Sequence, residues 1–144
     1  MTDLLAVPAR WVTLRTATED GLPVVVLVDQ AVVTTCPYGD HPVQVAVGVP
    51  YQAGEDGLPT EAETPRLKEM EQHLVDAAGG EARLVAVMTL EGVREWTFYA
   101  RGTQWAAPLR EIGLSVLETE DPTYEGLREL SGLSHREIGA ALHI

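Results

Sequence analysis

Leu-Val-Ala-Val-Met-Thr-Leu-Glu-Gly-Val-Arg-Glu-Trp-Thr-Phe-Tyr-Ala, residues 84–100, is the stretch on which the predicted fold rests. Two runs rich in β-branched and aromatic residues flank Glu91-Gly92, and glycine readily takes the positive φ of a tight turn. The stretch therefore predicts a β-hairpin. Its predicted cross-strand pairs are Leu90 with Val93, Met88 with Glu95, Ala86 with Thr97 and Leu84 with Tyr99. Both faces are largely apolar, which is typical of central strands.

A second hairpin is predicted near the N-terminus. Residues 10–17 alternate as a strand does, and residues 24–28 form an unbroken apolar run. The Asp-Gly pair at residues 20–21 is a hairpin-turn signal between them. Residues 31–35 either extend the sheet or form a crossing segment.

The next two elements are a strand and a long helix. Residues 43–49 carry valine at every second position, which makes them the clearest strand of the chain. Two helix starts compete after the loop that follows: a capping box of Thr60 with Glu63, and Thr64-Pro65 with proline at the first helical position. We expect a loose first turn and a firm helix from about Pro65 to Ala78. Its predicted apolar stripe is Leu67, Met70, Leu74 and Val75.

Three elements are predicted after the central hairpin. A short helix covers residues 103–112, and a strand follows from Leu114 to Leu117. Asp121-Pro122 then starts a helix that runs to about Ser131. The predicted anchors of the first helix are Trp105, Leu109 and Ile112. A last amphipathic helix is predicted to dock Ile138 and Leu142.

The order of these elements predicts the fold class. From Val43 onward it is strand, helix, strand, strand, helix, strand, which is the split β-α-β pattern of an α+β, ferredoxin-like fold. We expect a single domain over residues 1–144. Its predicted parts are an N-terminal hairpin (about 10–35), a split β-α-β core (about 42–120) and C-terminal helices (121–144).

Composition and charge narrow the classes of function. The 144 residues are 45% hydrophobic and 22% charged, as expected of a globular domain with a real core. The net charge is −12, and no Lys or Arg lies between Arg15 and Arg66. Such a surface repels phosphate backbones, so we expect no nucleic-acid partner. The acidity either serves solubility alone or provides a face that docks on a basic protein partner.

The cysteine count, the N-terminal residues and the motifs of the chain bear on its localisation and its cofactors. Cys36 is the only cysteine, so no intramolecular disulfide can form. The first residues do not resemble a signal peptide, and no apolar run approaches the ~20 residues of a membrane span. We therefore expect a cytoplasmic protein without a membrane segment. No metal-ligand spacing and no nucleotide-binding or hydrolase motif occurs, so we expect no metal and no cofactor.

Glu95 is the carboxylate that the sequence singles out. It lies on a strand that is predicted to be central, where desolvation raises a pKa and can create a general acid or base. Thr97 and Tyr99 share its face, while Arg94 points the opposite way. We take Arg94, Glu95, Thr97 and Tyr99 as candidate ligand-binding residues, with Glu95 and Tyr99 as the only catalytic candidates. The alternative is a Glu95 that is ion-paired or solvated and a Tyr99 that only caps the core.

Several short motifs in order resemble the domain-of-unknown-function 695 family. They are Gly57-Leu58-Pro59-Thr60, then Leu67, Glu71 and Leu74, then Thr89, Gly92, Arg94-Glu95 and Phe98-Tyr99, and finally Asp121-Pro122 with Tyr124, where the family often has Trp. The resemblance spans most of residues 10–130 and implies no agreed activity. The family is in turn similar to the regulator of ribonuclease E activity B, an acidic ferredoxin-like protein that inhibits a ribonuclease by binding it.

Three hypotheses of function follow. The first is a non-enzymatic, regulatory domain that binds another protein. The second is an enzyme or small-ligand binder with a pocket around Glu95, Thr97 and Tyr99. The third is a homodimer joined through a free sheet edge.

Overall fold

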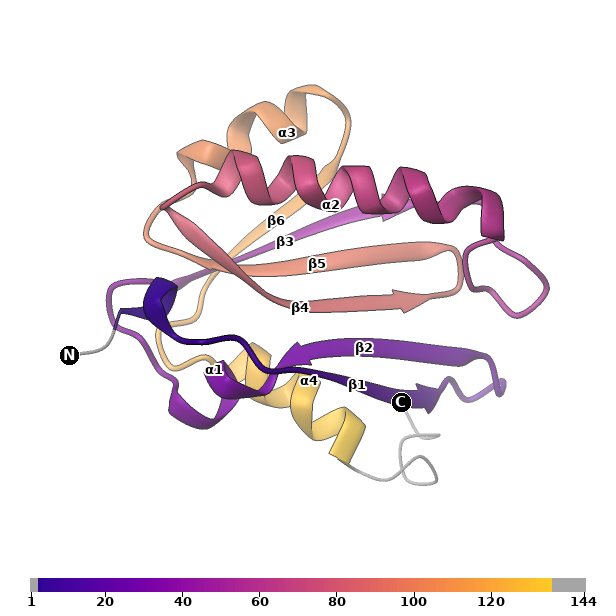
Figure 1. The fold of residues 1–144 in the computed structure, drawn as a ribbon, viewed down its shortest axis with the longest axis horizontal. Coiled ribbons are helices and arrows are strands. Elements are labelled where there is room, and N and C mark those ends of the chain that lie inside the picture. The colour runs from indigo at the N-terminus through magenta and orange to yellow at the C-terminus, as the bar shows by residue number, and fades with distance from the viewer. Residues whose placement is uncertain (1–2, 136–144) are drawn as a thin grey trace.

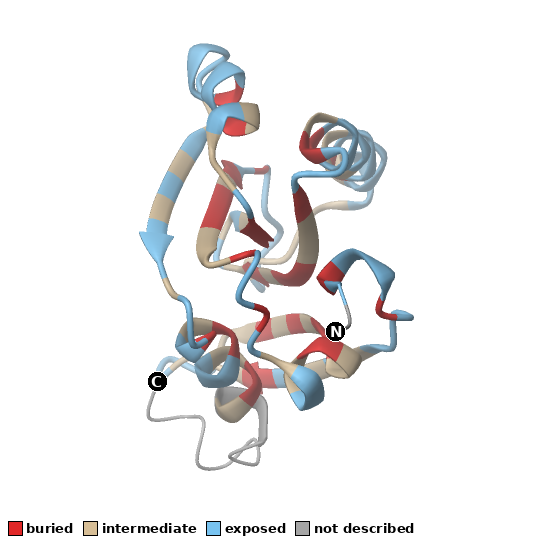
Figure 2. Ribbon diagram, turned by 90° about the vertical axis from the view of Figure 1, so that its left-hand side faces the viewer, coloured by how far each residue is buried: buried red, intermediate tan, exposed pale blue. Residues whose placement is uncertain are grey.

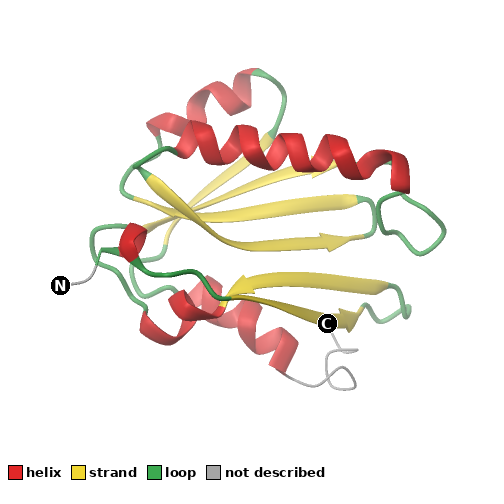
Figure 3. Cartoon of the chain, viewed as in Figure 1, coloured by secondary structure: helices red, strands yellow, loops and turns green. Residues whose placement is uncertain are grey.

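A computed structural model describes residues 3–135 as one twisted sheet with helices on both faces (Figure 1). The sheet has six strands in the order β1-β2-β4-β5-β3-β6, and every neighbouring pair is antiparallel (Figure 3). The strands are β1 (Trp11–Ala17), β2 (Pro23–Asp29), β3 (Val43–Pro50), β4 (Ala82–Leu90), β5 (Val93–Ala100) and β6 (Ser115–Glu120). An α+β fold is therefore confirmed. The predicted helix around Ile138 and Leu142 lies outside the described residues.

The central hairpin is β4–β5, and its turn is where the sequence predicts it. Glu91 and Gly92 both have positive φ, 41° and 84°, as a two-residue hairpin turn requires. Three of the four predicted pairs are confirmed. The fourth is wrong, because a bulge between Leu84 and Ala86 inserts one residue and pairs Leu84 with Phe98 instead of Tyr99.

Two hydrophobic cores lie on the two faces of the sheet (Figure 2). The first core packs α2 (Thr64–Ala78), the 3₁₀ turn η3 (Gln104–Ala106) and α3 (Ala107–Glu111) against β3, β4 and β5. The second core packs η1 (Leu4–Ala6), α1 (Gln30–Thr35) and α4 (Glu125–His135) against the opposite face, chiefly on β2 and β4. Covering on both faces explains the unbroken apolar runs of the central strands.

The long helix, α2, begins at the second of the two predicted helix starts, Thr64-Pro65. A 3₁₀ turn, η2 (Glu61–Glu63), precedes α2, and Pro65 occupies the first turn of α2. The capping box is wrong, because the Thr60 side chain makes no cap hydrogen bond and Glu63 accepts instead from the backbone N–H of Gln52 and from Arg66. Val75, predicted in the apolar stripe, is 40% exposed, while Leu67 and Leu74 are buried.

Other differences from the prediction have local causes. Residues 31–35 form a crossing segment and do not extend the sheet, because the carboxylate of Asp29 caps α1 at the backbone N–H of Ala31. Ile112 is 61% exposed and does not anchor α3, which ends at Glu111. Among the described residues, no helix is both long and apolar enough to cross a membrane.

The last described helix, α4, begins at Glu125, three residues after the predicted first position at Pro122. Tyr124 takes a positive φ of 60°, which breaks the chain direction after Asp121-Pro122. The carboxylate of Asp121 then accepts hydrogen bonds from the backbone N–H groups of Glu125 and Gly126. Asp121 therefore caps α4, but from outside the helix.

Candidate functional site

The structure divides the four candidate residues of β5 between the two faces of the sheet. Arg94 lies on the same face as α2, where its Nε donates to the Oγ1 atom of Thr89 at 2.9 Å. Glu95, Thr97 and Tyr99 lie on the opposite face, since successive strand residues alternate. These three residues share a face as predicted, but they line none of the principal hollows found among the described residues.

Tyr99 belongs to a buried hydrogen-bond network. Its hydroxyl donates to the Oδ2 atom of Asp121 at 2.6 Å and accepts from the Nε2 atom of Gln44 and the backbone N–H of Leu127, each at 3.2 Å. Its ring stacks on Tyr124 with centroids 3.8 Å apart. Burial and the nearby Asp121 carboxylate raise the pKa of Tyr99. Every contact of its hydroxyl is made within the protein, and these contacts attach α4 to the sheet.

Glu95 has a different environment. It is half-buried between Met88 of β4 and Gly48 of β3, and burial raises the pKa of its carboxyl group. Among the described residues, Glu95 makes no salt bridge and no side-chain hydrogen bond. The ion-paired Glu95 that one alternative predicted is therefore not found among the described residues. The group keeps the features of a desolvated carboxylate without an adjoining hollow.

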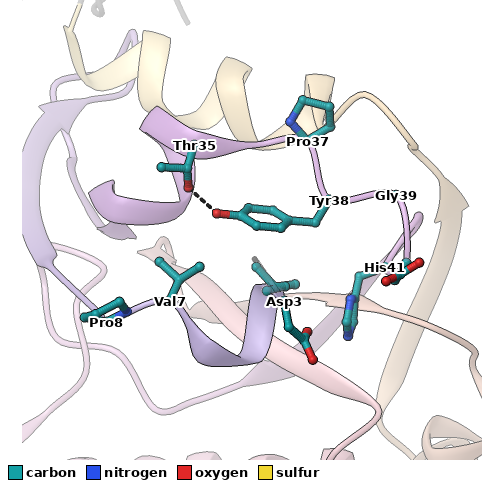
Figure 4. Close-up of a pocket in the computed structure, with 10 residues that line it drawn as sticks. Asp3, Val7, Pro8, Thr35, Pro37, Tyr38, Gly39 and His41 are labelled. Atoms are coloured by element: carbon teal, nitrogen blue, oxygen red, sulfur yellow. Dashed lines mark hydrogen bonds between the residues drawn. The ribbon is translucent and has the colours of Figure 1, made fainter. Parts of the chain in front are cut away.

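A hollow lined by charged and polar side chains lies elsewhere, between the N-terminal segment and the loop that joins α1 to β3 (Figure 4). This hollow has a volume of about 470 Å³, which is within the range of small-molecule sites. Asp3 and Asp40 provide its carboxylates and His41 its imidazole. Its other lining residues are Leu4, Val7, Pro8, Thr35, Pro37, Tyr38 and Gly39.

His41 is fully buried and has one unsatisfied nitrogen. Its Nε2 atom accepts from the Nε of Arg101 at 3.4 Å, so the neutral ring carries its proton on Nδ1. That Nδ1 atom is buried and has no partner among the described residues. Burial, followed by the charge of Arg101, lowers the pKa of His41 and keeps it neutral at pH 7. His41 therefore keeps one buried N–H donor without a partner among the described residues, in the wall of the hollow.

The position of His41 explains why sequence reasoning did not select it. The sequence offers only a histidine in a turn cluster directly before the valine-rich strand. Its partners come from distant segments: Arg101 follows β5, and the backbone carbonyl of His41 accepts from the Tyr124 hydroxyl at 2.9 Å. Asp3, which pairs with Arg101 at 3.4 Å, comes from the N-terminus.

Exposed carboxylates gather at the opposite end of the sheet. Three connections lie at that end: the β1–β2 turn, the β3–α2 loop and the β4–β5 turn (Figure 1). We call their exposed carboxylates the acidic rim, which consists of Glu19, Asp20, Glu55, Asp56, Glu61 and Glu91. These three connections contain no Lys, Arg or His. The rim therefore gathers negative charge in connections that carry no basic residue of their own.

Hydrogen bonds hold two of these connections together. The backbone N–H of Gly92 donates to the carbonyl of Gly57 at 2.9 Å, and the backbone N–H of Tyr51 donates to the carbonyl of Gly92 at the same distance. The Tyr51 hydroxyl adds a bond to the Gly57 carbonyl at 2.5 Å. The β3–α2 loop is thus fixed on the β4–β5 turn, and the rim carboxylates are presented from an ordered backbone.

The described residues offer no obvious metal site and no activated thiol. No group of three or more His, Cys, Asp or Glu residues among them is arranged to hold a metal ion. Cys36 is half-buried, and burial raises the pKa of its thiol, which disfavours the reactive thiolate.

Comparison with known proteins gives one match. A family model described as "Family of unknown function (DUF695)" matches residues 9–125. No curated protein and no solved structure matches the chain. The matched range contains all the motifs on which the predicted resemblance rests. The further similarity to the regulator of ribonuclease E activity B stays a prediction.

Proposed function

We propose, for a chain that belongs to the DUF695 family of unknown function, that it is a non-enzymatic regulatory module that binds a basic protein partner. The family description names no activity, so the proposal rests on the molecule itself. The observation that carries it is the acidic rim, where six exposed carboxylates gather at one end of the sheet without a basic residue among them.

The rim has the properties of an electrostatic docking surface. Charges of one sign that lie close together steer an oppositely charged partner and raise the association rate. The ordered loops reduce the conformational entropy that binding would otherwise cost. Carboxylates spread evenly for solubility would need neither their concentration at one end nor hydrogen bonds between the loops.

Two finer points belong to this proposal. We infer a ferredoxin-like core, because β3 to β6 lie in the order β4-β5-β3-β6 with antiparallel neighbours and helices between β3 and β4 and between β5 and β6. We also infer a cytoplasmic location from the single cysteine. Both fit the predicted similarity to a protein that inhibits an enzyme by binding it.

Matched charge variants test the proposal. The rim variant carries Glu19→Gln, Glu55→Gln and Glu91→Gln. Its control carries Glu69→Gln, Glu111→Gln and Glu129→Gln, which are exposed glutamates outside the rim. Both variants lose three charges of the same kind. Each variant is then used to capture proteins from native lysate at low and moderate salt. The captured proteins are identified, and their amounts are compared with those captured by the wild type.

The expected result is a basic partner that the wild type and the control capture at low salt and release as salt rises. The rim variant should capture it several-fold less, because the lost charges act on the association rate. Capture that is independent of salt, or equal losses in the two variants, would contradict a docking role of the rim.

A second candidate function rests on Glu95. Its half-buried carboxylate with a raised pKa is the feature that favours an enzyme or small-ligand binder around Glu95, Thr97 and Tyr99. A Glu95→Gln variant that keeps partner binding but loses a turnover would favour this candidate over the first. A homodimer through a free sheet edge, at β1 or β6, is the third proposal, and the molecular mass in solution tests it.

A further inference from the structure

Two arginines lie in one row across the sheet. Arg15 of β1 pairs with Val25 of β2, Val25 pairs with Thr89 of β4, and Thr89 pairs with Arg94 of β5. Directly paired residues of antiparallel strands share a face, so all four side chains are on the same side of the sheet. The two arginines therefore flank a floor made by Val25 and Thr89.

A hollow of about 280 Å³ lies over this row. Leu27 and Val87, the paired residues of the adjacent row, extend the apolar floor. Leu58 and Pro59 of the β3–α2 loop and Thr64, the first residue of α2, complete the lining. The hollow thus has two guanidinium groups, two hydroxyl groups and an apolar floor.

Arg94 is half-buried and forms no salt bridge with another described residue. Its Nε donates to Thr89, but among the described residues no carboxylate forms a salt bridge with Arg94 or with Arg15. Burial lowers the pKa of Arg94, against a smaller opposing effect of the Glu71 carboxylate. By contrast Arg83, which is the other partly buried arginine among residues 3–132, has the Asp29 carboxylate at 2.6 Å. A desolvated cation without an ion pair costs stability, which a bound anion would offset.

We propose that this hollow binds a small organic carboxylate, with its charged group between Arg94 and Arg15 and its aliphatic body on Val25, Leu27 and Val87. The guanidinium fork matches a carboxylate through two parallel N–H···O bonds. The apolar floor favours an organic acid over inorganic phosphate, which has no apolar surface to bury. Binding of a carboxylate in this hollow does not require that the rim docks on a partner.

The overall electrostatic field of the protein does not favour an anionic ligand. The net charge of −12 repels anions, and Glu61 and Glu63 lie in the 3₁₀ turn directly before Thr64. Saturable binding of a small anion would therefore require directed contacts with the arginines. This makes a simple probe informative.

The test uses four probes on the full chain: 3-methylbutanoate, its neutral amide 3-methylbutanamide, the cation 3-methylbutylamine, and inorganic phosphate. Backbone amide NMR shifts of Thr64, Thr89 and Arg94 are followed during each titration. Saturable shifts with 3-methylbutanoate alone support the proposal. Shifts with phosphate and none with 3-methylbutanoate overturn the assignment to an organic acid, and equal shifts with the amide overturn the role of charge.

Two variants separate this role from a structural one. Arg94→Met keeps an unbranched apolar stem and removes the charge, while Arg110→Met removes the same charge from an exposed pair on α3. We expect Arg94→Met to weaken binding of 3-methylbutanoate by about tenfold or more, and Arg110→Met to leave it unchanged. We also expect Arg94→Met to unfold at the same temperature as the wild type or higher, because a desolvated charge is gone. Unchanged affinity in Arg94→Met overturns the proposal.

Discussion

Asp29 is a buried carboxylate on which contacts of several elements depend. Its side chain is fully buried and pairs with Arg83 at 2.6 Å, and it accepts hydrogen bonds from the backbone N–H groups of Arg10 and Ala31. Arg83 in turn donates to the carbonyls of Leu4 and Val7. One carboxylate thus connects the N-terminal segment, the start of β1 and α1 to the central strand β4.

Asp29→Ala should therefore destabilise the fold strongly. It leaves the partly buried Arg83 without its counter-charge and α1 without its cap, and loss of one partner from a buried pair costs about 3–5 kcal/mol. Urea unfolding measures the loss. Glu118→Ala, which breaks the exposed pair with Arg110, serves as the control and should cost about 1 kcal/mol or less. A loss of similar size in the two variants would contradict the role of Asp29.

Glu95 should make stability depend on pH in a defined direction. Burial raises the pKa of Glu95, so the folded state binds its proton more tightly than the unfolded state does. The stability from this group is fully present below the unfolded pKa of about 4.3 and is lost as the pH rises through the folded pKa. Glu95→Gln, which stays neutral, should therefore raise the thermal midpoint at pH 7.

The same substitution should have little effect at about pH 4, where the wild-type carboxyl group is already protonated in the folded state. Calorimetry at the two pH values checks this. Glu111→Gln, on the exposed end of α3, should change the midpoint little at either pH. If Glu95→Gln lowered the midpoint at pH 7, Glu95 would be an ionised partner in a favourable contact.

At the residue scale, the sequence predicts a side chain's face better than its partners. Alternation along β5 correctly separates Arg94 from Glu95. The partners of Tyr99 are Asp121, 22 residues away, and Gln44, 55 residues away. Local periodicity carries no information on such contacts, so the network of Tyr99 and the position of His41 could not be predicted.

At the scale of elements, two glycines with nearly the same backbone angle test how the β3–α2 loop is held. Gly21 has φ +83° and Gly57 has φ +82°, so alanine is strained at both. A Cβ atom at Gly57 would lie 3.1 Å from the Cα of Glu91, whereas one at Gly21 would meet nothing within 4 Å. The difference between the two alanine variants therefore isolates the contact between the loop and the β4–β5 turn.

We expect Gly21→Ala to cost about 1 kcal/mol from backbone strain, and Gly57→Ala to cost about 1–3 kcal/mol more because the loop must move. Urea unfolding gives both values. NMR shifts of the Gly92 amide, which donates to the Gly57 carbonyl, should change in Gly57→Ala only. Equal losses of unfolding free energy in the two variants would mean that the loop moves away from the β4–β5 turn without a cost in stability.

Elements with local signals could be predicted, and elements shaped by tertiary contacts could not. The central hairpin and β3 follow from turn chemistry and period two, and α2 from its proline and apolar spacing. The late start of α4 depends on Tyr124, whose positive φ accompanies its stacking on Tyr99. The bulge in β4 likewise has no signal in a run of small and branched residues.

At the scale of the whole molecule, the sequence predicts the amount of charge but not its place. The carboxylates of the acidic rim are up to 72 positions apart in the chain, from Glu19 to Glu91. Only the order of strands brings the three connections to one end of the sheet. Their mutual repulsion is therefore a property of the fold, and it should oppose folding when salt does not screen it.

Salt should accordingly stabilise this protein, and the rim should account for much of the effect. The Debye length falls from about 30 Å at 0.01 M to about 8 Å at 0.15 M, so sodium chloride should raise the thermal midpoint over this range. The rim variant should show a smaller rise than the control variant with the same loss of charge, because it removes carboxylates that lie together. Choline chloride in place of sodium chloride should give the same rise, since screening depends on ionic strength and not on a specific cation. Equal salt dependence in the two variants would mean that repulsion is spread over the whole surface, and the rim would then lose the electrostatic distinction on which its docking role depends.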